Sequence, residues 1–139
     1  VLEYNCRFGD PETQPIMMRL KSNLAELCLL ATQGKLDKAN IEWDARSAMG
    51  VVLAANGYPD AYPSGEVIGL PSDTIDAKVF HAGTKIDGND VVTSGGRVLC
   101  ATALGVDTKQ AQTSAYQLLE KINWPSAYFR TDIGFKAIK

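Results

Sequence analysis

The sequence predicts an α+β fold, in which a small, mostly antiparallel β-sheet with one packed helix follows a separate strand and helix. Two strand-like runs, residues 78–86 and 91–104, are joined by the short turn Asp87-Gly88-Asn89-Asp90, which favours a hairpin. Residues 47–55 form a third apolar run with paired β-branched side chains. Residues 108–122 carry a single apolar stripe at helical spacing, so we expect them to form the packed helix.

The first part of the chain reads as a strand, a turn and a helix. Residues 1–8 alternate polar and apolar side chains, and residues 9–13 are turn formers. Thr13 is expected to cap a helix that ends at Gly34, and its apolar stripe is Ile16, Leu20, Leu24, Leu27 and Ala31. Ser22-Asn23 is a second potential cap, so the helix can break near Lys21. Met17, Met18, Leu29 and Leu30 are interpreted as core packing.

Residues 34–46 are polar except for Leu36, Ile41 and Trp43, which is typical of a linker. We interpret Trp43 as a hydrophobic anchor. The domain boundary is predicted in this stretch, with residues 1–36 in one unit and residues 37–139 in a small C-terminal unit.

Three further features of the second unit follow from short stretches of its sequence. Residues 58–70 hold three of the six prolines, so we expect an ordered, exposed loop there. Thr108 is expected to cap the last helix, which ends before Trp124-Pro125. Arg130 and Asp132 are close enough in sequence to pair.

Composition limits the classes of function. A length of 139 residues with 45% hydrophobic residues suits one ordinary core, and a net charge of −2 gives no basic surface for nucleic acid or an anionic membrane. No run of about 18 apolar residues is present. Three cysteines without metal-like spacing favour reduced thiols and a cytoplasmic location. Because the chain begins with Val1 in an apparent strand, we expect it to be the C-terminal part of a longer protein or a processed chain.

The first strand brings three chemically capable side chains to one face. Glu3, Asn5 and Arg7 alternate with apolar residues and therefore point the same way. A carboxylate and an amide oxygen are ligands that Mg²⁺ accepts, and a guanidinium matches phosphate oxygens. The three residues could form one wall of a metal and phosphate site, but a half-exposed strand with an ordinary polar face would show the same alternation.

Two other motifs allow both a structural and a chemical interpretation. Ser94-Gly95-Gly96-Arg97 interrupts a strand pattern, which favours a bend, although two glycines followed by an arginine could also bind an anion. His81 is the only histidine. A single histidine in a strand is more often a structural residue than a catalytic one, although its side chain can titrate near neutral pH.

Five ordered strings give the chain a resemblance to a known family. They are residues 2–14 (LEYNCRFGDPETQ), 50–59 (GVVLAANGYP), 79–84 (VFHAGT), 93–100 (TSGGRVLC) and 130–134 (RTDIG). Together they resemble the phosphoribosylamine–glycine ligase family, also called glycinamide ribonucleotide synthetases, and span nearly the whole chain. The first string resembles the closing metal-binding segment of the family's ATP-grasp domain, and the rest resembles its compact C-terminal sheet domain.

The resemblance implies a ligase of purine biosynthesis that uses ATP to join glycine to phosphoribosylamine through a glycyl phosphate. Glu3 and Asn5 match family positions that bind Mg²⁺ or Mn²⁺. From its chemistry, Arg7 is expected to contact phosphate or the acyl phosphate. Asp10 is a candidate contact for a substrate amine, or a turn residue, and Glu12 suits a helix dipole.

The chain shows no glycine-rich phosphate loop, lysine-bearing lid or adenine pocket, which the resemblance places upstream, in N-terminal domains missing here. We therefore expect the 139 residues alone to be inactive. Two alternatives remain: a free-standing ligand-binding or interaction module, with residues 94–97 as its anion site, and an ATP-grasp ligase for another acceptor amine.

Overall fold

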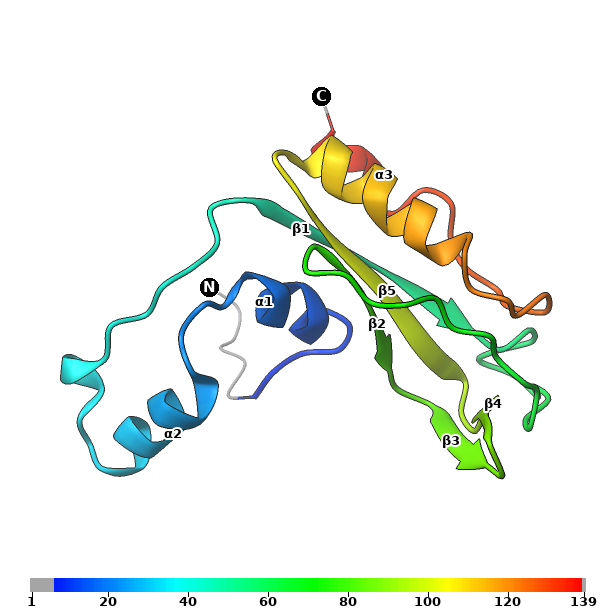
Figure 1. Cartoon of the computed structure of the whole chain (residues 1–139), viewed down its shortest axis with the longest axis horizontal. Coiled ribbons are helices and arrows are strands. Elements are labelled where there is room, and N and C mark those ends of the chain that lie inside the picture. Colours follow the sequence, from blue (N-terminus) through cyan, green and yellow to red (C-terminus); the bar gives the residue numbers. More distant parts are fainter. Residues whose placement is uncertain (1–6, 139) are drawn as a thin grey trace.

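The computed structural model describes residues 7–138 and contains a central three-stranded antiparallel sheet between two helices (Figure 1). The strands are β1 (Ser47–Ala54), β5 (Arg97–Gly105) and β2 (Ala77–His81), with β5 in the middle. Strands β3 (Thr84–Asp87) and β4 (Asp90–Thr93) form a separate two-stranded hairpin. The predicted α+β class with small antiparallel sheets is confirmed.

The strand register places different residues on the two faces of the sheet. Ala103 pairs with Met49, Ala101 with Val51 and Leu99 with Leu53, so these residues share one face. Helix α3 (Thr108–Leu119) covers this face with its only apolar stripe, and together they enclose the core. Its buried residues are Ala111, Ala115, Leu118 and Leu119. Val79, Ile68 and Trp124 complete this core.

Helix α1 (Thr13–Arg19) lies on the opposite face of the sheet. Pro15 of α1 approaches Gly50 of β1, and Gly50 also faces the buried Sγ of Cys100. The polar residue Thr102 is fully buried on this face and its hydroxyl lies 3.4 Å from the Cys100 sulfur. Burial raises the pKa of the Cys100 thiol, which therefore stays protonated at neutral pH.

The predicted helix of residues 13–34 is interrupted, as Ser22-Asn23 indicated. Helix α1 ends at Arg19, and helix α2 (Leu24–Thr32) begins after Asn23, whose Oδ1 accepts from Ala25 N at 3.0 Å. A short 3₁₀ helix, η1 (Leu36–Lys38), follows α2. None of these three helices contains a buried residue. Core packing of Leu29 was therefore a wrong prediction, because among residues 7–138 no element covers that side chain, which is 57% exposed.

The two predicted helix caps, Thr13 and Thr108, are wrong: α1 has no side-chain cap at its N-cap residue Glu12, and the cap of α3 lies one residue earlier. Thr13 is the first helical residue of α1, after Glu12, and its hydroxyl donates to Gly9 O. Asp107 caps α3 instead of Thr108, because its Oδ1 accepts from Gln110 N at 2.7 Å.

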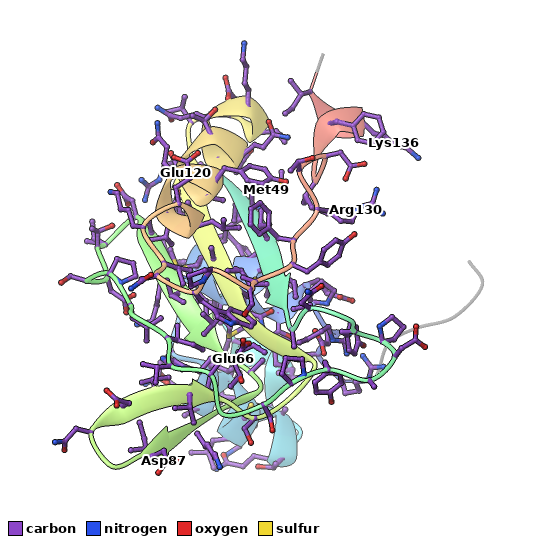
Figure 2. The ribbon with its side chains drawn as sticks, turned by 90° about the vertical axis from the view of Figure 1, so that its right-hand side faces the viewer. Met49, Glu66, Asp87, Glu120, Arg130 and Lys136 are labelled. Atoms are coloured by element: carbon purple, nitrogen blue, oxygen red, sulfur yellow. The ribbon has the colours of Figure 1, made fainter. Side chains whose placement is uncertain are left out.

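The two long strand runs are each divided. Residues 78–86 bend at Ala82-Gly83 between β2 and β3, and residues 91–104 bend at Ser94-Gly95-Gly96 between β4 and β5. The hairpin turn at Asp87–Asp90 is confirmed. The loop of residues 58–70 is largely exposed and is held by Glu66, whose carboxylate accepts from Trp124 Nε1 at 3.0 Å and Ser126 Oγ at 2.8 Å (Figure 2). The last segment ends in the 3₁₀ helix η2 (Phe135–Ala137), and Arg130 pairs with Asp132 at 2.6 Å.

Within residues 7–138, the helices are all too short to span a membrane.

Candidate functional site

The predicted metal and phosphate strand is described only at its end. Glu3 and Asn5 lie outside the described residues. Arg7 is exposed, and its Nη1 donates to Phe8 O at 3.1 Å. Among residues 7–138, its guanidinium forms no ion pair with a carboxylate.

The turn after Arg7 is compact and leads directly into α1. Thr13 N donates to Gly9 O at 3.2 Å, and Ile16 N donates to Glu12 O at 3.2 Å. The Glu12 carboxylate folds back over the Cα of Gly9, where any larger residue would collide with it. A larger residue at position 9 would make the exposed Glu12 side chain turn away from this position.

Asp10 and Arg97 join this turn to the sheet. Arg97 Nη2 lies 2.8 Å from Asp10 Oδ2, and both side chains are about half exposed. Sequence reasoning selected Asp10 and the Ser94-Gly95-Gly96-Arg97 motif separately and did not pair them. No local signal could reveal this contact, because it joins residues that are 87 positions apart and meet only when α1 packs on β5.

The glycines before Arg97 allow two chain bends to touch. A Cβ on Gly83 would lie 2.8 Å from Gly95 Cα, and a Cβ on Gly95 would lie 3.0 Å from Gly83 Cα. Ser94 N also donates to Gly83 O at 2.7 Å. The interpretation of residues 94–97 as a structural bend is confirmed, since only glycine permits this backbone contact.

Aromatic side chains cover the other side of the bend. The Tyr58 ring occupies the space that a side chain on Gly96 would need, and Tyr62 lies 6.1 Å from Tyr58 between ring centroids. Ala55 N donates to Gly96 O at 2.8 Å, which attaches the bend to the end of β1. Arg97 thus projects from a backbone that is fixed on two sides.

His81 lies near this bend but has a structural contact. Its Nδ1 is 2.9 Å from Thr84 Oγ1, across the turn between β2 and β3. Asp73 lies close to the same strand. Partial burial opposes its ionisation, but hydrogen bonds from Val79 N and Lys78 outweigh that effect and hold the pKa of Asp73 below its usual value.

The described residues do not form a metal site by themselves. Between residues 7 and 138, no three His, Cys, Asp or Glu side chains are grouped so that they could hold an ion. Glu3 and Asn5 supply the donor chemistry that Mg²⁺ and Mn²⁺ accept, a carboxylate and an amide oxygen, and they precede the turn directly. By donor type, these two residues fit such an ion as part of a larger ligand set.

A cavity of about 490 Å³ lies away from the Asp10–Arg97 pair. It lies where β1 begins, near the end of β5 opposite Arg97. Its lining residues are Pro15, Ile16, Arg19, Trp43, Ser47, Ala48 and Thr108. The candidate site is therefore an exposed surface rather than an enclosed pocket.

Comparison with known proteins assigns the chain to a family. The family model of the phosphoribosylglycinamide synthetase C domain matches residues 48–136. The chain belongs to this family. The match covers β1 through η2, so it includes the sheet, the bend with Arg97 and helix α3.

Similar proteins carry the family's activity in their names. The phosphoribosylamine–glycine ligase of Yersinia pestis is 61% identical over 141 residues, covering 99% of this chain and 33% of that protein. The ligase of Escherichia coli O6:H1 is 59% identical over 142 residues, covering 100% and 33%. A crystal structure of the Thermotoga maritima ligase is similar with a TM-score of 0.75 and 36% identity, covering 95% of this chain and 32% of that one. The chain thus spans about a third of the length of the curated relatives it matches.

Proposed function

We propose that this chain is the C-terminal part of a phosphoribosylamine–glycine ligase and forms one wall of its active site. The observation that carries the proposal is the identity of about 60% with ligases of this name along the whole chain, together with the family match over residues 48–136. In purine biosynthesis such an enzyme would join glycine to phosphoribosylamine. The part of the active site that binds ATP would lie in the part of the relatives that this chain does not span.

The proposed reaction has two steps. The glycine carboxylate attacks the γ-phosphorus of ATP, which forms glycyl phosphate and releases ADP. The amine of phosphoribosylamine then attacks the carbonyl carbon, forming the amide and releasing inorganic phosphate and a proton. Both steps bring anionic or electron-rich groups together, so the site must neutralise negative charge and hold the groups in line.

Glu3, Asn5 and Arg7 are the residues of this chain that we assign to charge neutralisation. Glu3 and Asn5 would hold Mg²⁺ or Mn²⁺, which would neutralise phosphate charge when bound. Arg7 would donate to a phosphate or acyl-phosphate oxygen, and its exposed guanidinium is consistent with that role. The Asp10 carboxylate, now shared with Arg97, would accept from the substrate amine.

The domain assignment is part of the proposal. Residues 1–36 would belong to the ATP-grasp domain, and residues 37–139 would form the small C-terminal domain. Helix α1, which would belong to the first domain, contacts strands β1 and β5 of the sheet. The location would be the cytoplasm.

A chimera tests this function directly. This chain would replace the matching third of the Escherichia coli ligase, to which it is 59% identical without large length differences. We expect ATP-dependent formation of glycinamide ribonucleotide from glycine and phosphoribosylamine. The chain alone should form none. An inactive but folded chimera would contradict the proposal.

Site variants of the chimera separate the residue roles. Glu3→Ala and Arg7→Ala should each reduce turnover by about 100-fold or more, because each removes charge stabilisation at the transferred phosphoryl group. Lys85→Ala, an exposed cation in β3, is the matched control and should leave turnover unchanged. Activity with another amine instead of phosphoribosylamine would favour the different ATP-grasp ligase.

A further inference from the structure

Arg97 is carried by backbone that the fold fixes on two sides. Its carbonyl oxygen accepts from Gly83 N at 3.0 Å, and the oxygen of the preceding Gly96 accepts from Ala55 N at 2.8 Å. The bends at Gly83 and Gly95 also touch through their backbones, with no room for a Cβ between them. The guanidinium of Arg97 therefore projects from a rigid edge of the sheet.

The acidic partner of Arg97 has weaker support. Asp10 lies in the turn that precedes α1, and 61% of its side chain is exposed. Within residues 7–138, Arg97 is the only ion-pair partner of this carboxylate, with 2.8 Å between Nη2 and Oδ2. A carboxylate accepts several hydrogen bonds, so one more donor can bind to this exposed group.

Asp10 is also close in the chain to a residue assigned to phosphate chemistry. It follows Arg7 by three residues, which limits the separation of their Cα atoms to about 11 Å even in a fully extended chain. The Arg7 side chain is exposed as well. One small substrate could therefore contact both residues.

Stability alone gives the Asp10–Arg97 pair little value. Ion pairs between exposed side chains contribute little to folding, and the Arg97 side chain is itself 46% exposed. What the pair supplies is direction, because a planar guanidinium held by the sheet orients a carboxylate that lies in a turn. The positive charge also offsets that of Asp10, which would otherwise repel a substrate that carries a phosphate.

We propose that Arg97 is a positioning residue of the ligase, which holds the Asp10 carboxylate in the orientation that accepts from the amine of phosphoribosylamine. Arg97 acts through Asp10 and does not bind the amine, since both groups are hydrogen-bond donors. A fixed carboxylate aligns the amine for attack on the carbonyl carbon of glycyl phosphate. The inference rests on the proposed function and adds one residue to its second step.

A double-mutant cycle on the kinetics of the chimera described above tests the inference. Arg97→Met should lower kcat/KM for phosphoribosylamine by about tenfold or more, because a misplaced contact spoils the alignment, and Asp10→Asn should lower it at least as much. Adding Arg97→Met to Asp10→Asn should change it by less than about twofold, since no carboxylate is left to position. Arg97→Lys, which keeps the charge, should restore part of the loss.

The ratio of products provides a readout that a purely structural role would not change. Glycyl phosphate that the amine fails to capture reacts with water and returns glycine and inorganic phosphate. Arg97→Met should therefore raise the ADP formed per glycinamide ribonucleotide from about one to about two or more, while KM for ATP and for glycine changes by less than about twofold. The urea midpoint of the variant should stay near that of the parent chimera.

Lys78 provides a matched control. It pairs with Asp73 at 3.1 Å, and the two side chains are 47% and 45% exposed, so this ion pair resembles the Asp10–Arg97 pair in exposure. Lys78→Met removes the same kind of contact elsewhere on the surface. It should leave kcat/KM and the product ratio unchanged.

The outcomes separate this inference from the proposed function. Full kcat/KM of Arg97→Met in an active chimera would overturn the inference and leave the ligase assignment intact. An equal loss from Arg97→Met with and without the Asp10 carboxylate would also overturn it, because Arg97 would then act independently of Asp10. A folded parent chimera without activity would contradict the proposed function, and this inference with it.

Discussion

Helices α2 and α3 are similar in local sequence signals but opposite in tertiary setting. Both begin after a side-chain cap, Asn23 for α2 and Asp107 for α3. Helix α3 buries one apolar stripe on the sheet and leaves polar residues outside, whereas α2 is apolar nearly all round and has half-buried leucines but no fully buried residue. The comparison teaches that caps determine where a helix begins, while packing determines how much of the stability of the protein depends on it.

The largest difference in stability between the α3-covered core and helix α2 should appear when one leucine in each is replaced by alanine. Leu99 of β5 is 1% exposed at the centre of the core, and Leu99→Ala should lower the free energy of unfolding by about 3 kcal/mol through lost burial and a cavity. Leu29→Ala in the isolated chain should change it by less than about 0.5 kcal/mol. Urea unfolding of both variants checks this, and a comparable loss in Leu29→Ala would show that α2 is packed against the rest of the chain.

Removing the side-chain caps of α3 and α2 should give a smaller difference in stability between the two helices. Asp107→Ala should cost about 1 kcal/mol of global stability, because α3 unfolds together with the sheet. Asn23→Ala should accelerate amide exchange within residues 24–32 and leave the urea midpoint unchanged. Hydrogen exchange measured beside urea unfolding distinguishes the two responses. A lowered midpoint in Asn23→Ala would mean that α2 unfolds cooperatively with the core.

The residues just before β1, Asp44 to Arg46, should give the stability of the protein a weak pH dependence. Arg46 donates to the Asp44 carboxylate through its side chain at 2.8 and 3.0 Å and through its backbone N at 2.9 Å, which holds the pKa of Asp44 well below its usual range. Because the pKa of Asp44 is lower in the folded state than the ordinary value of about 3.9, its ionised carboxylate stabilises the fold at pH values above about 3.9. This stabilisation is lost as the pH falls toward the lowered pKa.

The stability difference between the parent chain and Asp44→Asn should therefore be largest near pH 7 and shrink below about pH 4. Unfolding midpoints collected from pH 7 to pH 3 measure it. A difference that grows on acidification would contradict the assigned ion pair. Arg46 also pairs with Asp76 at 2.8 Å, so Asp76→Asn serves as a comparison on the same guanidinium.

The smallest expected effect concerns the ion pair that joins the first turn to the sheet. Asp10 and Arg97 are both substantially exposed, so a double-mutant cycle with Asp10→Asn and Arg97→Met should give a coupling of about 0.5 kcal/mol that falls at 1 M salt. A coupling above about 2 kcal/mol would indicate that the pair becomes desolvated. Repeating the double-mutant cycle in the chimera shows whether the rest of the ligase changes the solvent exposure of the Asp10–Arg97 pair.

Local sequence signals were sufficient for the element types and for several boundaries. The turn at Asp87-Gly88-Asn89-Asp90, the break at Ser22-Asn23 and the bend at Ser94-Arg97 follow from backbone preferences of a few adjacent residues. The apolar stripe of residues 108–122 predicted both a helix and its buried face. The family resemblance in five ordered strings was also a property of the sequence alone, and the match over residues 48–136 confirms it.

Only the tertiary structure decided which apolar residues are buried and which distant side chains meet. The same helical spacing occurs in α2 and α3, but burial depends on whether another element lies opposite, and that is a long-range property of the fold. The Asp10–Arg97 pair arises because α1 crosses the face of β5, a packing that no local preference encodes. Metal binding by Glu3 and Asn5 stays a prediction, since the sequence supplies these donors and the described structure begins after them.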